Sequence, residues 1–131
     1  MSLKPGWLFA LGAAWNLVIG LAVLLAPLFS LRLLYGHEPS ADDPLLAMLN
    51  RDFAFCVLLF GVGYGIVAVD PSRNHGLIWV GIIGKLGVVA TLGQRWLTDV
   101  ATAWVLPAAA GDFVFAALFA CFLWRSNPTH S

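Results

Sequence analysis

The sequence contains little charge. Seven Lys/Arg and seven Asp/Glu occur among its 131 residues, so that 11% of the chain is charged, against about 25% in a typical soluble domain. The formal net charge is zero, and the basic residues do not cluster. This composition excludes a disordered tail and an ordinary soluble enzyme, and the lack of a basic surface excludes a nucleic-acid binder.

Residues that bind metals or cofactors are also scarce. The two cysteines, Cys56 and Cys121, lie far apart in the chain, which excludes a disulfide-rich module and a Cys-x-x-Cys redox enzyme. The three histidines fall in predicted loops or near the C-terminus, which argues against a haem or zinc site inside the protein. The glycine-rich stretch 61–65 lies within an apolar run, so it is not a phosphate loop. The sequence therefore predicts no metal or cofactor and does not favour an enzyme.

Long apolar runs dominate what remains. Hydrophobic residues make up 60% of the chain, and the mean hydropathy is +0.86. Four stretches match the roughly 20 apolar residues that a transmembrane helix requires. They cover about residues 7–29, 45–69, 77–93 and 102–124. We predict an all-α integral membrane four-helix bundle with antiparallel up-down topology, in a single domain over residues 1–131, with the first stretch retained as a helix rather than cleaved as a signal peptide.

The charges in the loops predict an orientation. Four spans place both termini on one side of the membrane, together with the loop between the second and third spans. That side carries Lys4, Arg73 and Arg125, whereas the opposite side carries Arg32 and Arg95. The positive-inside rule then favours cytoplasmic termini, which we expect to lie at a bacterial inner membrane.

Four of the 14 charged residues fall inside the predicted spans: Arg51, Asp52, Lys85 and Asp112. Each costs on the order of 2.5–3.5 kcal/mol at the centre of a membrane helix, and such residues normally face the interior of a bundle and pair with one another. Two are positive and two are negative, so the set is neutral. Each is therefore a candidate for a functional site or a polar core.

Depth along the helices predicts which of these residues meet. Measured from the side of the termini, Lys85 lies about 12 Å deep, Asn16 about 14 Å and Asp112 about 18 Å, at a rise of about 1.5 Å per residue. We therefore expect one polar layer that contains these three residues and a Lys85–Asp112 ion pair. Small residues beside them, such as Gly20, predict that the polar faces pack closely against neighbouring helices.

A second polar layer is expected nearer the opposite interface, from Arg51, Asp52, Arg95 and Asp99. Tyr64 either donates a hydrogen bond into the core or lies at the membrane interface, and the second position is favoured. Gly61-x-x-x-Gly65 in the same helix matches a small-residue packing pair. The ligand-binding or polar-core candidates are thus Asn16, Arg51, Asp52, Tyr64, Lys85 and Asp112.

Several short stretches resemble the small four-helix bacterial membrane proteins of the DoxX-like group. They are Trp15-Asn16 with Gly20, Gly61-x-Gly63-Tyr64, the loop Asp70-Pro71-Ser72-Arg73-Asn74, Gly84-Lys85 and Gly111-Asp112-Phe113. The resemblance implies the four-helix fold. Founding members of that group look like subunits of a membrane thiosulfate:quinone oxidoreductase, and others are linked to oxidative stress. No motif that would carry a redox activity is matched here, so the resemblance is extended to the fold alone.

Two interpretations of the embedded charges remain open. They are either structural ion pairs that fix helix register, or they line a cavity for a ligand, a proton or an ion. The first hypothesis for function is an accessory subunit or a binder of an apolar small molecule, a lipid or a quinone, acting as a monomer, a homodimer or part of a larger membrane complex. The alternatives are a small proton-coupled transporter that uses Asp112 and Lys85, and an intramembrane isomerase. A binder should contain a cavity of a few hundred Å³ that touches the polar layer.

Overall fold

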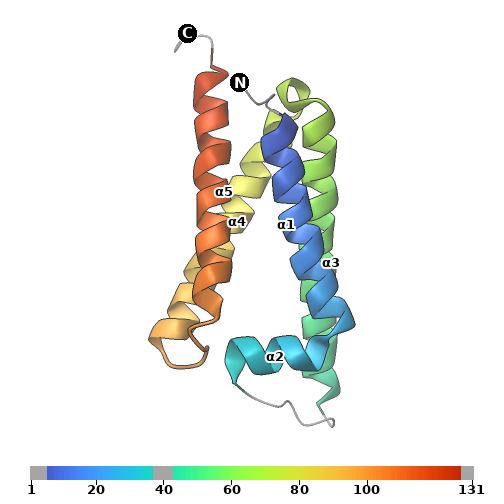
Figure 1. Cartoon of the computed structure of the whole chain (residues 1–131), viewed down its shortest axis with the longest axis vertical. Coiled ribbons are helices and arrows are strands. Elements are labelled where there is room, and N and C mark those ends of the chain that lie inside the picture. The colour runs from blue at the N-terminus through green and yellow to red at the C-terminus, as the bar shows by residue number, and fades with distance from the viewer. Residues whose placement is uncertain (1–5, 37–42, 128–131) are drawn as a thin grey trace.

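The computed structural model describes residues 6–36 and 43–127, and the regular elements within these ranges are helical (Figure 1). In chain order they are α1 (Gly6–Leu25), α2 (Pro27–Tyr35), α3 (Pro44–Val69), the short 3-10 helix η1 (Pro71–Arg73), α4 (His75–Leu97) and α5 (Val105–Arg125). The predicted all-α class is confirmed for the described residues.

Four of these helices are long and apolar enough to cross a membrane. They are α1, α3, α4 and α5, with 20, 26, 23 and 21 residues. At about 1.5 Å per residue, a 20-residue helix matches the roughly 30 Å thickness of the hydrocarbon core. The predicted membrane bundle is therefore confirmed. In Figure 1 the start of α1, the end of α5 and η1 all lie at one end of the molecule, hereafter the terminal end.

The first predicted span, 7–29, is longer than the helix that the structure shows. α1 ends at Leu25, and Pro27 begins the separate helix α2, because proline lacks the N–H that would continue α1 and suits the first turn of a new helix. The hydroxyl of Ser30 donates to the carbonyls of Ala26 (2.9 Å) and Ala22 (3.3 Å), which adds side-chain hydrogen bonds where the two helices join. Residues 31–35, expected in a loop, are helical. Figure 1 shows α2 lying across the end of the bundle opposite the terminal end.

Hydrogen bonds from Thr102 connect α2 to the chain just before α5. The Thr102 hydroxyl donates to the carbonyl of Leu33 at 2.6 Å, and its backbone N–H donates to the carbonyl of Leu34 at 2.7 Å. α2 then ends at Gly36, which has a left-handed φ of 70° and donates its N–H to Arg32. These bonds hold α2 between the α1–α3 side and the α5 side of the molecule.

We expect Thr102→Val to loosen α2 selectively. The substitution removes the hydroxyl bond to Leu33, worth about 1 kcal/mol, and a longer bond from the Trp104 N–H at 3.3 Å, but leaves the backbone bond to Leu34. Amide exchange in α2, followed by mass spectrometry in detergent micelles, should become about fivefold faster while α1 is unchanged. Thr91→Val is the matched control, because the Thr91 hydroxyl bonds only within its own helix, to Gly87. Equal exchange in the two variants would show that Thr102 does not anchor α2.

The long helices associate as two pairs. α1 packs along α3 and α4 packs along α5, whereas contacts between the two pairs are far fewer. Figure 1 shows the pairs close together at the terminal end and further apart toward α2. The close approach of α1 to α3 uses Gly20 and Gly61: a Cβ at Gly20 would lie 2.8 Å from the Leu58 side chain, and one at Gly61 would lie 3.2 Å from Asn16 Cβ. Gly65 faces open space instead, so its predicted part in this packing is wrong.

An apolar core fills the terminal end of the bundle. All four long helices contribute to it, with Phe9, Ala13, Tyr64, Val67, Ile78, Ile82 and Phe119. The rings of Phe9 and Phe119 lie 4.7 Å apart, and those of Tyr64 and Phe119 lie 5.2 Å apart. This tight packing fixes the four helices relative to one another, and so it positions the polar residues that lie next to the core on the side facing α2.

Candidate functional site

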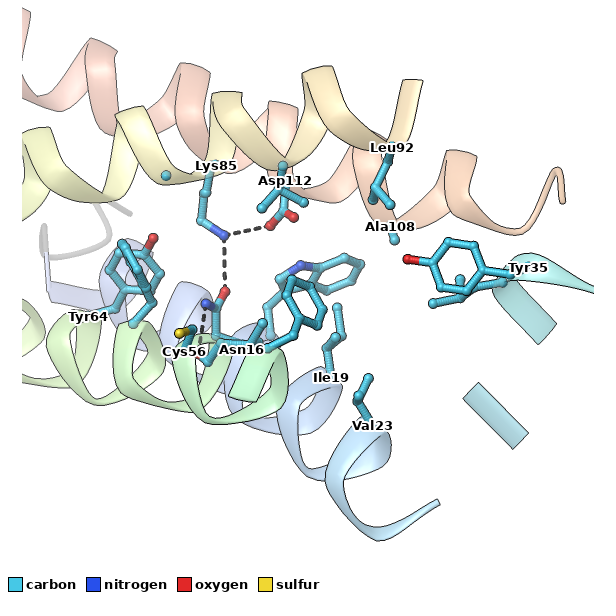
Figure 2. A pocket seen from close by; sticks show the side chains of 17 residues that line it. Asn16, Ile19, Val23, Tyr35, Cys56, Tyr64, Lys85, Leu92, Ala108 and Asp112 are labelled. Atoms are coloured by element: carbon cyan, nitrogen blue, oxygen red, sulfur yellow. Dashed lines mark hydrogen bonds and ion pairs between the residues drawn. The ribbon is translucent and has the colours of Figure 1, made fainter. Parts of the chain in front are cut away.

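Lys85 joins the two helix pairs through hydrogen bonds to both. Its Nζ donates to Asp112 Oδ1 at 2.7 Å on α5 and to Asn16 Oδ1 at 3.0 Å on α1. Asn16 Nδ2 in turn donates to the carbonyl of Val57 on α3 at 3.2 Å, as Figure 2 shows. The predicted Lys85–Asp112 ion pair and the layer shared with Asn16 are confirmed. One chain of hydrogen bonds therefore connects all four long helices.

The Lys85 ammonium is almost completely buried. The side chains of Lys85 and Asp112 are 3% and 14% exposed, and Asn16 is buried. Nζ also lies 5.1 Å from the centre of the Tyr64 ring and 5.3 Å from that of Phe115, at distances where aromatic faces attract cations. With a carboxylate, an amide oxygen and two rings around it, the charge is compensated without a further anion.

Tyr64 belongs to the core, and its predicted position at the membrane interface is wrong. The residue is 2% exposed, and its hydroxyl donates to the carbonyl of Gly81 at 3.4 Å. The ring fits against α4 because Gly81 lacks a Cβ, which would lie within 3 Å of it. Tyr64 is therefore the part of the terminal core that borders Lys85, which lies one turn after Gly81 on α4.

Arg51 and Asp52 lie outside this cluster. Both are exposed, as are Arg95 and Asp99, so the predicted second polar layer is wrong. α3 begins at Pro44, which places Arg51 and Asp52 near its start. A long Arg side chain near the end of a membrane helix can extend to the membrane surface and needs no partner in the core.

A cavity adjoins the Lys85 cluster on the side facing α2. Its volume is about 140 Å³ and its walls are mainly apolar. Figure 2 shows the cluster at one end and Tyr35 of α2 at the other, with the Tyr35 hydroxyl directed toward the interior. The lining comes from every described α-helix: Trp15, Asn16, Ile19, Val23, Leu34, Tyr35, Phe53, Cys56, Val57, Phe60, Tyr64, Gly84, Lys85, Val88, Leu92, Ala108 and Asp112.

The cavity continues into a larger groove between α3 and α4. The groove has a volume of about 670 Å³, and five residues line both spaces: Tyr35, Phe53, Gly84, Val88 and Leu92. Asn50, Thr91 and Arg95 add polar groups to the groove. The cavity that touches the polar layer is thus smaller than the few hundred Å³ expected, but it is extended by an open groove on the flank of the bundle.

Among the lining residues that were not in the candidate set predicted from sequence, Trp15 and Tyr35 carry a side-chain N–H or O–H donor. Trp15 precedes Asn16 in α1, and its Nε1 is buried without a hydrogen-bond partner. Tyr35 was expected in a loop, since the helix that carries it was not predicted. Burial raises the pKa of Tyr35, an effect that the nearby Arg95 guanidinium partly opposes, so the phenol stays protonated and able to donate. The signal that the sequence offered for Trp15 was its indole N–H donor, which stands directly beside Asn16 in the same apolar stretch.

The cysteines and histidines do not build a metal centre in the described part of the chain. Cys56 and Cys121 are both exposed, although Cys56 also lines the cavity. The His75 ring packs edge-on against Phe122, with centroids 6.1 Å apart. Among residues 6–36 and 43–127, no three His, Cys, Asp or Glu side chains are grouped as metal ligands.

Comparison of the chain with protein-family models, with curated proteins and with solved structures found no match. The resemblance to the DoxX-like group therefore stays a prediction.

Proposed function

We propose that this membrane protein is a binding module or accessory subunit that holds an apolar small molecule, a lipid or a quinone, in the cavity beside Lys85. The observation that carries the proposal is the juxtaposition of an apolar cavity with a polar cluster whose charges already compensate one another. We place the module in a bacterial inner membrane with cytoplasmic termini, as a monomer, a homodimer or a subunit of a larger complex.

The electrostatics of the cavity favour a ligand without net charge. Lys85 is paired with Asp112 at 2.7 Å, so neither residue offers an uncompensated charge to an incoming molecule. A charged group that entered the cavity beside Lys85 would have to leave water and the headgroups without a counter-ion in return, which is strongly unfavourable. A neutral molecule that is already dissolved in the bilayer avoids that cost.

The size of the cavity limits which part of the ligand it can hold. About 140 Å³ is close to the roughly 150 Å³ of an engineered cavity that binds benzene, and below the about 300–1,000 Å³ of a pocket for a drug-sized molecule. The cavity therefore suits one ring or the end of one chain. The rest of the ligand would lie in the groove between α3 and α4.

Filling the cavity should abolish binding. In Ala108→Leu, the larger side chain projects from the wall on α5 into the cavity. Ala110→Leu adds the same atoms at an exposed position two residues away. We expect the first variant to lose at least tenfold in affinity for a short-chain quinone or a brominated phosphatidylcholine, and the second to bind like the wild type. Quenching of tryptophan fluorescence in nanodiscs measures both. Identical quenching in the two variants would refute the proposal.

A proton-coupled carrier makes a different prediction for the same residues. Such a carrier needs a carboxylate that releases and regains a proton, so Asp112→Asn should abolish flux of any substrate that wild-type vesicles move. If the protein is a binding module, vesicles with the wild type or with Asp112→Asn show no such flux. Proton-coupled uptake in wild-type vesicles that Asp112→Asn removes would favour the carrier over the binding module.

A further inference from the structure

The wall of the cavity contains a hydrogen-bond donor without an acceptor. Within the described residues, Trp15 Nε1 is the buried side-chain nitrogen or oxygen atom that has no partner. Buried polar groups are normally paired, and leaving one unpaired costs about 1–3 kcal/mol. Trp15 lines the cavity although Nε1 itself is buried, so a molecule bound there would lie against the indole, and a small shift of the ring would bring Nε1 to it.

Packing holds the Trp15 indole in place. The ring lies against Gly111 of α5, where any side chain would overlap it, and its centroid is 6.1 Å from that of Phe115. Gly111 directly precedes Asp112, so the indole lies beside the polar cluster. The indole is therefore largely in position before a ligand arrives, which lowers the entropic cost of binding.

The groove between α3 and α4 provides the route to this donor. These two helices contact each other much less than α1 contacts α3 or α4 contacts α5. The groove shares five lining residues with the cavity, and at Gly87 it is open, since a Cβ there would meet nothing within 4 Å. The groove lies on the flank of helices that span the membrane, so a molecule within the bilayer can enter without crossing water.

We propose that the ligand enters from the bilayer between α3 and α4 and that its carbonyl oxygen accepts a hydrogen bond from Trp15 Nε1. This inference rests on the proposed binding function. An indole N–H only donates, so its partner must be an acceptor. A carbonyl oxygen is an uncharged acceptor that bilayer-soluble molecules commonly carry, and it has two sources here: a quinone ring or the acyl ester of a lipid.

Matched ligands with and without the carbonyl test the contact with Trp15. One pair is a short-chain alkyl quinone and the corresponding alkylbenzene, and the other is a diester and a diether phosphatidylcholine. We expect Trp15→Phe to weaken binding of the carbonyl member of one pair about fivefold to tenfold and to change the other member less than twofold. The responsive pair identifies the source. Trp79→Phe, at an exposed position on α4, should change nothing.

The outcomes separate failure of this inference from failure of the proposed function. If Trp15→Phe weakens both members of each pair equally, or neither, Trp15 is not the donor although the cavity still binds. If wild-type protein binds none of the four radiolabelled probes more tightly than Ala108→Leu does, the binding function itself is wrong. Either result overturns the contact with Trp15.

The entry route is tested by kinetics. Gly87 and Gly93 both lie on α4 with open space around them, but only Gly87 belongs to the groove lining. We expect Gly87→Phe to slow association of the probe at least tenfold in a stopped-flow measurement, and Gly93→Phe to leave the rate unchanged. Equal association rates in the two variants would overturn entry between α3 and α4.

Discussion

Lys85→Met is expected to destabilise the bundle by about 3–5 kcal/mol, because it leaves the Asp112 carboxylate, which is only 14% exposed, without its partner inside the bundle. It also removes the donor to Asn16, which breaks the chain of hydrogen bonds between the two helix pairs. Equilibrium unfolding in mixed micelles measures the loss. Few single substitutions in this chain should cost more, since the ammonium makes two hydrogen bonds and contacts two aromatic rings.

The double variant Lys85→Met/Asp112→Leu should recover much of that loss. Replacing a buried ion pair by apolar residues of similar size is often neutral or stabilising, whereas removing one partner is not. Arg51→Met is the matched control, because Arg51 is an exposed cation on a membrane helix and its replacement should change stability by no more than about 0.5 kcal/mol. Failure of the double variant to recover would mean that the penalty does not arise from an unpaired carboxylate.

Phe119→Ala is expected to cost about 3–5 kcal/mol, the range for deletion of a buried aromatic side chain. Phe119 is fully buried, and its ring contacts those of Phe9 and Tyr64 in the terminal core. Unfolding in the same micelles measures the effect. The neighbouring Leu118 is exposed, and Leu118→Ala should cost less than about 1 kcal/mol because its side chain leaves no internal cavity.

Two substitutions of equal size on α4 compare the packing of the terminal core with the packing around the cavity near α2. Ile78 is fully buried in the terminal core, so Ile78→Ala should cost about 2–5 kcal/mol. Leu92 lines the cavity and the groove, where much of its surface faces space that is already open, so Leu92→Ala should cost less than half as much. Equal costs would contradict a packed terminal end and an open end near α2.

The polar layer was predictable from sequence because it depends on depth alone. A straight helix has a fixed rise per residue, so the positions of Asn16, Lys85 and Asp112 along their helices follow from the ends of the apolar runs. The small charge content left few other partners for Lys85. The same reasoning failed for Arg51 and Asp52, because depth does not say which way a side chain points when it lies near the end of a helix.

Features that depend on contacts between distant residues were not predictable in this way. The position of Tyr64 in the core depends on Gly81 of a neighbouring helix. The end of α1 at Pro27 was also hard to predict, because membrane helices often tolerate proline. The cavity arises because α2 lies across the bundle and the helix pairs separate. A single sequence contains no signal for that separation, so the place of Trp15 in the cavity wall came only from the structure, although its position beside Asn16 was a hint in the sequence.

The most direct test of a ligand-holding cavity is mass spectrometry of the small molecules that copurify with the protein from its membrane. Wild type and Ala110→Leu should both retain one apolar molecule per chain that Ala108→Leu lacks, because only the last variant fills the space beside Lys85. If all three proteins carry the same molecules in the same amounts, the cavity holds no specific ligand, and the Lys85 cluster serves only to hold the four helices together.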